Sequence, residues 1–275
     1  MQEEKILQKK LQGLTPEEQA ELLQLEESVE LEKAKPNIIG NFLSFVKYVW
    51  PEFIEGSHHK IINKKFNDLA NGKIKRLIIN MPPRHTKSEF ASYLLPAWMI
   101  GKDPRLKIIQ ATHTADLAID FGRKTKNLVD QSNYRELFQT RLQEDSKAAG
   151  KWKTEQGGEY FAAGVGGAIT GRGANLLIID DPHKEQDIKK DSKAFDKAMS
   201  WYTSGPRQRL QPGGAIVVVM TRWSTKDITG QLLKAQTEEG SDQWEVVELP
   251  AILPDGKPVW PEFWTSEELL KTKAS

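Results

Sequence analysis

The chain has 275 residues, enough for one sizeable core, and a net charge of +1, which argues against a uniformly basic protein that coats nucleic acid. Its lack of cysteine excludes disulfides, thiol catalysis and zinc–cysteine sites, and suits a reducing cytoplasm. No apolar run is long enough to span a membrane and no signal peptide is evident, so the composition is that of a soluble globular protein.

The first segment is acidic and helical in pattern. Residues 1–34 contain nine Glu and four Lys, and their leucines recur at helical spacing. Thr15-Pro16-Glu17-Glu18 is typical of an N-cap followed by a first-turn proline and acidic residues. We therefore expect a helical arm over residues 1–35 that ends before Pro36. A solvated acidic helix packed on the core is the plainer interpretation, and a partner-binding arm is the alternative.

Apolar runs and helical patterns then alternate over residues 36–250, the expected core. After a helix over Ile38–Trp50, strands are predicted at Lys75–Asn80, Leu106–Ala111, Glu159–Ala163, Leu176–Ile179, Ile216–Met220 and Trp244–Leu249, and helices at Glu89–Ile100, Ala115–Asp130, Ser192–Thr203 and Lys226–Thr237. This order predicts an α/β fold with a mainly parallel central sheet flanked by helices. Residues 251–275, rich in Pro and Trp and ending in a short helix, are expected to be an ordered extension leading to a further domain that is absent.

The run Met81-Pro82-Pro83-Arg84-His85-Thr86-Lys87-Ser88 follows the first predicted strand and precedes a helix. Strand, tight loop, Lys-Ser and helix together form the phosphate-binding arrangement of P-loop NTPases, in which loop N–H groups and the helix dipole face the phosphates. Lys87 is expected to reach the β- and γ-phosphates of ATP, and Ser88 to ligate Mg²⁺. Both glycines of G-x-x-x-x-G-K-[ST] are missing, because Met81 and Thr86 occupy their positions.

Two carboxylates end another buried strand, in Leu176-Leu177-Ile178-Ile179-Asp180-Asp181. The carboxyl ends of parallel strands share one edge, so these groups are expected where the loop also opens. Asp180 would then hold Mg²⁺, directly or through water, and Asp181 would orient or deprotonate the attacking water. A strand followed by an ordinary Asp-Asp-Pro turn is the alternative.

Thr221-Arg222 follows a third buried strand, where Thr221 is expected to sense the γ-phosphate or its water; a capping Thr and a surface Arg are the plainer interpretation. Phosphoryl transfer usually needs a cation, and Arg offers a fixed fork of donors. The candidates are Arg84, Arg123, Arg172, Arg207 and Arg209, of which Arg172 is favoured because flanking glycines allow close approach. His58-His59 lack carboxylates at metal-ligand spacing and are read as ordinary, near the nucleotide base.

Four blocks between about Trp50 and Trp264 resemble the ATPase domain of tailed-bacteriophage terminase large subunits: IINMPPRHTKSE, GAITGRGANLLIIDDPHK, RQRLQPGGAIVVVMTRW and WEVVELPAILPDGKPVWPE. Terminases often carry a loop of the Pro-Pro-Arg-x-Gly-Lys-Ser kind, so Thr86 is the real departure, and it is expected to weaken or slow nucleotide binding. The resemblance implies Lys87 and Ser88 as the Walker A pair and Asp180 as the Walker B carboxylate. It implies Asp181 as the catalytic carboxylate, where the family usually has Glu, with Glu185 as the alternative.

The resemblance further implies that Thr221 belongs to the motif coupling hydrolysis to movement, and that Arg123 acts in trans as an arginine finger. It implies an ATP hydrolase that drives double-stranded DNA into a procapsid in the host cytoplasm, as a homo-oligomeric ring or a monomer in isolation, with the portal protein and the small terminase subunit as partners. No acidic cluster for a nuclease is evident. Lys147–Lys153 and Lys189–Lys193 are candidate DNA contacts, although a solvated charged face is the plainer interpretation of each run. A helicase-like ATPase and a non-hydrolysing docking module are the alternatives.

Overall fold

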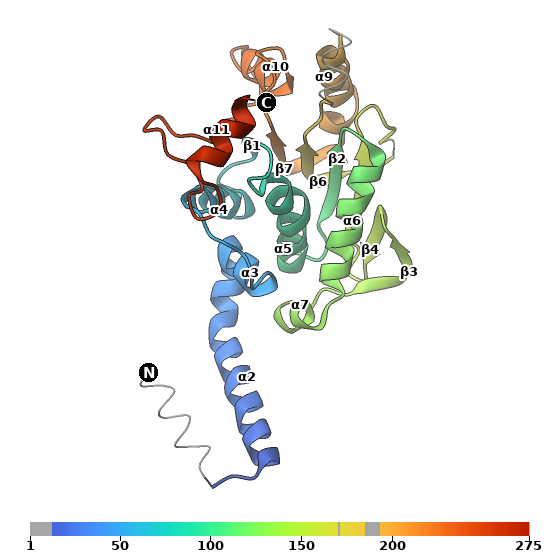
Figure 1. The fold of residues 1–275 in the computed structure, drawn as a ribbon. Coiled ribbons are helices and arrows are strands. Elements are labelled where there is room, and N and C mark those ends of the chain that lie inside the picture. Colours follow the sequence, from blue (N-terminus) through green and yellow to red (C-terminus); the bar gives the residue numbers. More distant parts are fainter. Residues whose placement is uncertain (1–12, 170, 185–192, 275) are drawn as a thin grey trace.

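The computed structural model describes residues 13–169, 171–184 and 193–274 (Figure 1). Its centre is an eight-stranded sheet of order β3-β4-β5-β2-β6-β7-β1-β8, in which only the β3–β4 and β4–β5 pairs are antiparallel. The strands are β1 (Arg76–Asn80), β2 (Lys107–Thr112), β3 (Leu142–Ala148), β4 (Lys151–Thr154), β5 (Glu159–Gly164), β6 (Ala174–Asp180), β7 (Leu210–Met220) and β8 (Glu245–Glu248). The predicted α/β class and mainly parallel sheet are confirmed, whereas the β3–β4 hairpin was not predicted.

The helices are α2 (Pro16–Gly40), α3 (Phe42–Val49), α4 (Ser57–Ala70), the π-helix η1 (Glu89–Leu94), α5 (Leu95–Lys102), α6 (Ala115–Val129), α7 (Ser132–Leu137), α9 (Ala194–Ser204), the 3₁₀-helix η2 (Pro206–Arg209), α10 (Ile228–Ala235) and α11 (Ser266–Ala274). Within the described ranges, none has the length and apolarity to cross a membrane. The helix predicted from Glu89 begins as a π-helix and becomes α-helical near Pro96, which has no N–H to donate.

The sheet is buried on both faces. Side chains alternate along a strand, so Leu77 and Ile79 of β1 pack into the cluster that contains Phe42, Phe90 and Trp98, while Ile78 packs into the opposite cluster. All three β1 residues are at most 1% exposed. This two-sided burial explains the continuous apolar runs that made the central strands recognisable.

Helix α2 begins as predicted but ends later than predicted. Thr15 and Glu18 form a capping box, with Glu18 N–H donating to Thr15 Oγ1 at 3.3 Å and Thr15 N–H donating to Glu18 Oε2 at 2.8 Å. The helix then continues through Pro36 to Gly40, because the turn beyond the proline carries Ile38 into the core. Figure 1 shows α2 projecting away from the sheet, and Ile38 is its only buried residue. The interpretation as an acidic helix packed on the core is therefore wrong for most of the length of α2.

The carboxyl ends of β6, β7 and β1 lie side by side. Asp180 of β6 is in register with Val219 of β7, and Met220 of β7 is in register with Asn80 of β1. Strand β7 therefore separates the strand that leads into the loop from the strand that ends in the two carboxylates. The three predicted motifs meet at this edge of the sheet.

Candidate functional site

The loop after β1 has an unusual backbone. Its first residue, Met81, donates its N–H to the Met220 carbonyl at 3.0 Å, which extends the pairing of β1 with β7. Among the described residues, the only non-glycine residues with positive φ are Arg84 (58°), Thr86 (66°) and Asp181 (41°). Non-glycine residues rarely adopt this region, and such strain gathers at functional sites. All three lie at the same edge of the sheet.

Thr86 is held in its strained conformation by His59 of α4. His59 Nδ1 accepts the Gly56 N–H at 2.8 Å, so in the neutral ring Nε2 carries the proton and donates to Thr86 Oγ1 at 2.7 Å. The Thr86 hydroxyl in turn donates to the His85 carbonyl at 2.5 Å. Burial, followed by the neighbouring His58 and His85, lowers the pKa of His59 to about 2, which keeps the ring neutral. A hydroxyl network thus stabilises the position where the P-loop pattern has glycine.

Lys87 and Asp181 form an ion pair across the site. Lys87 Nζ lies 2.6 Å from Asp181 Oδ2, and the lysine side chain is only 7% exposed. Thr221 N–H donates to Asp181 Oδ1 at 2.9 Å, and the Thr221 hydroxyl donates to the Met81 carbonyl at 3.2 Å. The structure therefore brings Lys87, Asp181 and Thr221 together, with the lysine and the carboxylate satisfying each other.

Asp180 lies deeper, beside the start of the helix after the loop. The Ser88 hydroxyl donates to Asp180 Oδ1 at 3.1 Å, and the Ser92 hydroxyl donates to Oδ2 at 2.7 Å. Asp180 is 1% exposed, and burial, with the negative charge of Asp181 second, raises its pKa against the opposing effect of Lys87 and both hydroxyls. A buried carboxylate that lacks full compensation fits a site completed by a cation.

This donor set fits Mg²⁺. Ser88 and Asp180 offer two hard oxygen ligands, and Mg²⁺ commonly takes one or two protein ligands while substrate phosphates and waters complete its shell. Within the described ranges no cluster of three or more His, Cys, Asp or Glu residues could hold a metal, so an all-protein cage is absent there.

A pocket of about 440 Å³ opens over the ion pair. It is lined by residues from the loop and from the ends of β2, β6 and β7: Pro83, Lys87, His113, Asp181, His183, Lys184, Thr221 and Trp223. His113, whose Nδ1 donates to the Asp181 carbonyl at 3.2 Å, was not predicted, nor were Ser92 and Trp223. His113 could have been found, because it follows the strand at Leu106–Ala111 and so reaches the same edge. Ser92 lies inside a helix and carries no such signal.

The predicted arginines are not gathered here. Arg84 is exposed in the loop, and Arg123, on the exposed face of α6, pairs with Asp120 at 2.6 Å. Arg172 precedes β6, so it lies at the amino edge of the sheet, where it pairs with Glu159 and covers the Phe161 ring at 4.0 Å from the centroid. The structure does not bring Arg172 to the loop of its own chain.

Arg207 and Arg209 lie in η2, before β7, at the amino edge of the sheet, whereas Arg222 directly follows Thr221 at the carboxyl edge. Arg207 pairs with Asp242 at 2.7 Å before β7 begins, whereas Arg222 pairs with Asp227 at 2.9 Å. Lys151 and Lys153 are exposed on β4 and alternate with buried Trp152, as expected of a half-solvated strand. Glu185 and residues 189–192 lie outside the described residues.

Comparison with family models finds no match for the chain, and no curated protein matches it. Among solved structures, the chain is similar to the HK97 bacteriophage large terminase, with a TM-score of 0.44 and 14% sequence identity. The similarity covers 70% of this chain and 39% of the terminase chain, so it spans less than half of that protein. A likeness at this level transfers no function to the chain.

Proposed function

We propose that the chain is an Mg²⁺-dependent ATPase that serves as the motor domain of a terminase-like DNA-packaging enzyme. The observation that carries the ATPase is the convergence of two motifs distant in sequence. Lys87 lies 2.6 Å from Asp181, and Ser88 lies 3.1 Å from Asp180, at the carboxyl edge of a largely parallel sheet. This edge is where open α/β sheets bind their ligands.

Each of these residues has a role in hydrolysis. The loop N–H groups and Lys87 would bind the phosphates, and Ser88 with Asp180 would hold Mg²⁺, which neutralises charge on the phosphate oxygens. Asp181 would accept a proton from the water whose oxygen attacks the γ-phosphorus, as the bond to the bridging oxygen breaks to leave ADP and phosphate. Lys87 must first leave its ion pair with Asp181 and pair with phosphate. Substrate binding would thus release Asp181 to act as the general base.

The motor role rests on the four sequence blocks that resemble terminases, and Thr221 supports it. Thr221 directly follows β7 and donates its backbone N–H to Asp181, so a change at the carboxylate would reach that strand directly. The proposed partner is double-stranded DNA, bound through its phosphates without regard to sequence and therefore in a salt-dependent way. A homo-oligomeric ring with the portal protein and the small terminase subunit, in the host cytoplasm, completes the proposal.

One observation favours a second candidate, a docking module that does not hydrolyse nucleotide. The Lys87–Asp181 ion pair is mostly buried, and Thr86 strains the loop that would bind phosphate. A protein in which nucleotide did not displace this ion pair would act only by binding partners at its surface. The two candidates differ in whether nucleotide opens the ion pair.

Phosphate release from Mg·ATP decides between them. We expect wild-type protein to hydrolyse ATP, faster with double-stranded DNA, and Lys87→Ala to lose at least about 100-fold in rate, because the lysine contacts the charge that develops on phosphate. Lys73→Ala, an exposed lysine paired with Asp68 at 3.3 Å, is the matched control. Equal rates for wild type and Lys87→Ala, with DNA and at high protein concentration, would contradict the ATPase.

A further inference from the structure

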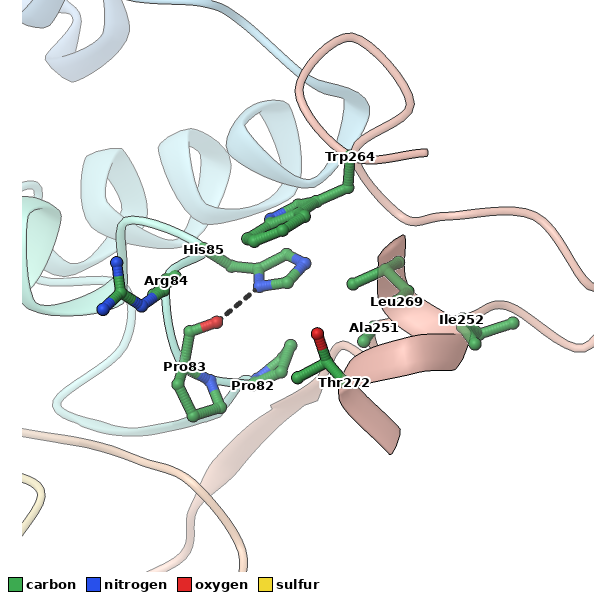
Figure 2. A pocket seen from close by; sticks show the side chains of 9 residues that line it. All are labelled: Pro82, Pro83, Arg84, His85, Ala251, Ile252, Trp264, Leu269 and Thr272. Atoms are coloured by element: carbon green, nitrogen blue, oxygen red, sulfur yellow. Dashed lines mark hydrogen bonds between the residues drawn. The ribbon is translucent and has the colours of Figure 1, made fainter. Parts of the chain in front are cut away.

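A second pocket lies on the other side of the same loop. It also has a volume of about 440 Å³, but its walls are mainly apolar (Figure 2). The wall residues important here come from the loop, from the segment after β8 and from the C-terminal segment: Pro82, Pro83, His85, Ile252, Trp264 and Leu269. The volume and apolar lining are those of a small-molecule site. Pro83 also lines the pocket over Lys87 and Asp181, so the two spaces adjoin through one residue.

His85 supplies this pocket with one directed polar atom. Its Nδ1 lies 2.8 Å from the Pro83 carbonyl, which can only accept, so in the neutral ring Nδ1 carries the proton and Nε2 is a bare acceptor. The side chain is 1% exposed, and Nε2 has no hydrogen-bond partner in the described structure. Figure 2 shows Nδ1 turned to Pro83 and the opposite edge of the ring facing Leu269. A buried acceptor without a donor costs free energy that a ligand can recover.

The C-terminal segment that closes the pocket is anchored by packing. Trp264 stacks on His85 at a centroid distance of 6.0 Å and an interplanar angle of 22°. Trp260 is 4% exposed and packs edge-on against His59, with centroids 5.0 Å apart. The wall opposite the loop is therefore held by the same histidine that supports Thr86.

We propose that this pocket receives the base of the nucleoside triphosphate, and that His85 Nε2 selects a purine with an amino group at C6, adenine over hypoxanthine or guanine. The inference rests on the proposed function, because the phosphates must bind the loop for the base to enter. The 6-amino group of adenine donates to Nε2, whereas the 6-keto oxygen of hypoxanthine or guanine sets two acceptors against each other. Sites that hydrogen-bond a substrate group discriminate strongly against analogues that lack it.

Calorimetric titration of wild-type protein with three Mg²⁺-bound ligands separates base from phosphate binding. We expect ATP to bind at least about tenfold more tightly than inosine triphosphate and than tripolyphosphate, which has no base. If neither ATP nor tripolyphosphate binds, the proposed function fails and this proposal falls with it. If tripolyphosphate and ATP bind equally, the loop is intact but the base pocket is wrong. If ATP and inosine triphosphate bind equally, the selection by His85 is wrong.

Filling the pocket provides the second test. Leu269→Trp should lower ATP affinity to that of tripolyphosphate and leave tripolyphosphate binding unchanged. Leu270→Trp is the matched control, because Leu270 is the next residue on α11, is 57% exposed and does not line the pocket. Normal ATP affinity in Leu269→Trp would overturn the proposal.

A measurement on unmodified protein guards against a misfolded variant. Photolabelling with 8-azidoadenosine triphosphate should mark the peptide that carries Trp264 and Leu269, and excess ATP should protect it. Protected labelling confined to other peptides would overturn the proposal.

The His85→Phe variant tests the selection of the base, because it keeps a ring beside Trp264 but has no acceptor. In this variant ATP and inosine triphosphate should bind equally, while tripolyphosphate affinity reports any damage to the loop.

Discussion

The carboxylates at the two edges of the central sheet differ in how their charge is compensated. At the amino edge, Asp242 pairs with Arg76 at 2.9 Å and with Arg207 at 2.7 Å, and Arg172 pairs with Glu159. At the carboxyl edge, Lys87 pairs with Asp181, the adjacent Asp180 accepts hydrogen bonds from two hydroxyl groups, and the backbone is strained beside them. Carboxylates that are each paired with arginine suit a structural role, whereas a buried carboxylate that lacks full compensation, beside strained backbone, suits a binding site. The following predictions test that contrast, beginning with the largest expected effect.

Asp181→Asn should abolish hydrolysis while preserving nucleotide binding. We expect a loss in rate of about 10² to 10⁴, the usual contribution of a general base, with ATP affinity unchanged or higher because Lys87 is released from its ion pair. Stopped-flow phosphate release and calorimetry measure the two effects separately. Asp255→Asn, an exposed aspartate, is the control. A proportional loss of binding and rate would instead assign Asp181 to phosphate binding or folding.

Asp180→Asn should stabilise the protein at neutral pH while removing Mg²⁺-dependent binding of ATP. The pKa of Asp180 is raised in the folded state above its ordinary value of 3.8, so the folded chain binds more protons there than the unfolded chain. Stability therefore falls as pH rises from that value toward neutrality, and the variant should lose this part of the pH dependence. We expect a gain on the order of 1 kcal/mol at pH 7.5, where each unit of pKa shift corresponds to about 1.4 kcal/mol.

Urea unfolding of wild type and Asp180→Asn between pH 4 and pH 8, without Mg²⁺, measures this effect. Asp196→Asn is the exposed control on α9. If the stability of wild type and of Asp180→Asn changed with pH in parallel, the negative charge of Asp180 would already be compensated in the folded protein.

Thr86 and His59 should be energetically coupled. Thr86→Gly removes strain of about 1–2 kcal/mol but leaves the buried His59 donor without a partner, at a cost of about 1–3 kcal/mol, so stability should change little. His59→Phe should destabilise more, because Thr86 keeps its strain and the Gly56 N–H loses its acceptor. A double-mutant cycle by urea unfolding should give a coupling of about 0.5–3 kcal/mol, and additive effects would show that the hydrogen bond contributes nothing.

Arg172→Ala should have the smallest effect on the reaction. Arg172 pairs with Glu159 and covers the Phe161 ring at the amino edge. Hydrolysis by isolated protein should therefore change less than about twofold. The loss of the half-buried ion pair and the ring contact should lower stability by about 1 kcal/mol. If the hydrolysis rate fell as steeply as in Lys87→Ala, the contrast between the two edges would be wrong.

Parts of the site were predictable because they depend on local sequence. Strands β1, β6 and β7 are buried on both faces, so they appear as apolar runs; Asp181 and Thr221 follow β6 and β7 directly, and Lys87 lies in the loop after β1. Arg172 was misleading, because its flanking glycines indicate a permissive backbone and not the edge of the sheet on which it lies. The β3–β4 hairpin was missed because its strands are polar and half-exposed, with lysines that read as a solvated face.

The sequence by itself determined which residues end or follow the buried strands, and hence that a lysine, two carboxylates and a threonine would share one edge. That inference needs only the alternation of strands and helices and the common direction of parallel strands. Tertiary structure alone decided how these groups pair. The Lys87–Asp181 ion pair, the support of Thr86 by His59 and the stacking of Trp264 on His85 each join segments far apart in the chain. Such contacts depend on packing in three dimensions, for which the spacing of residues along the chain carries no signal.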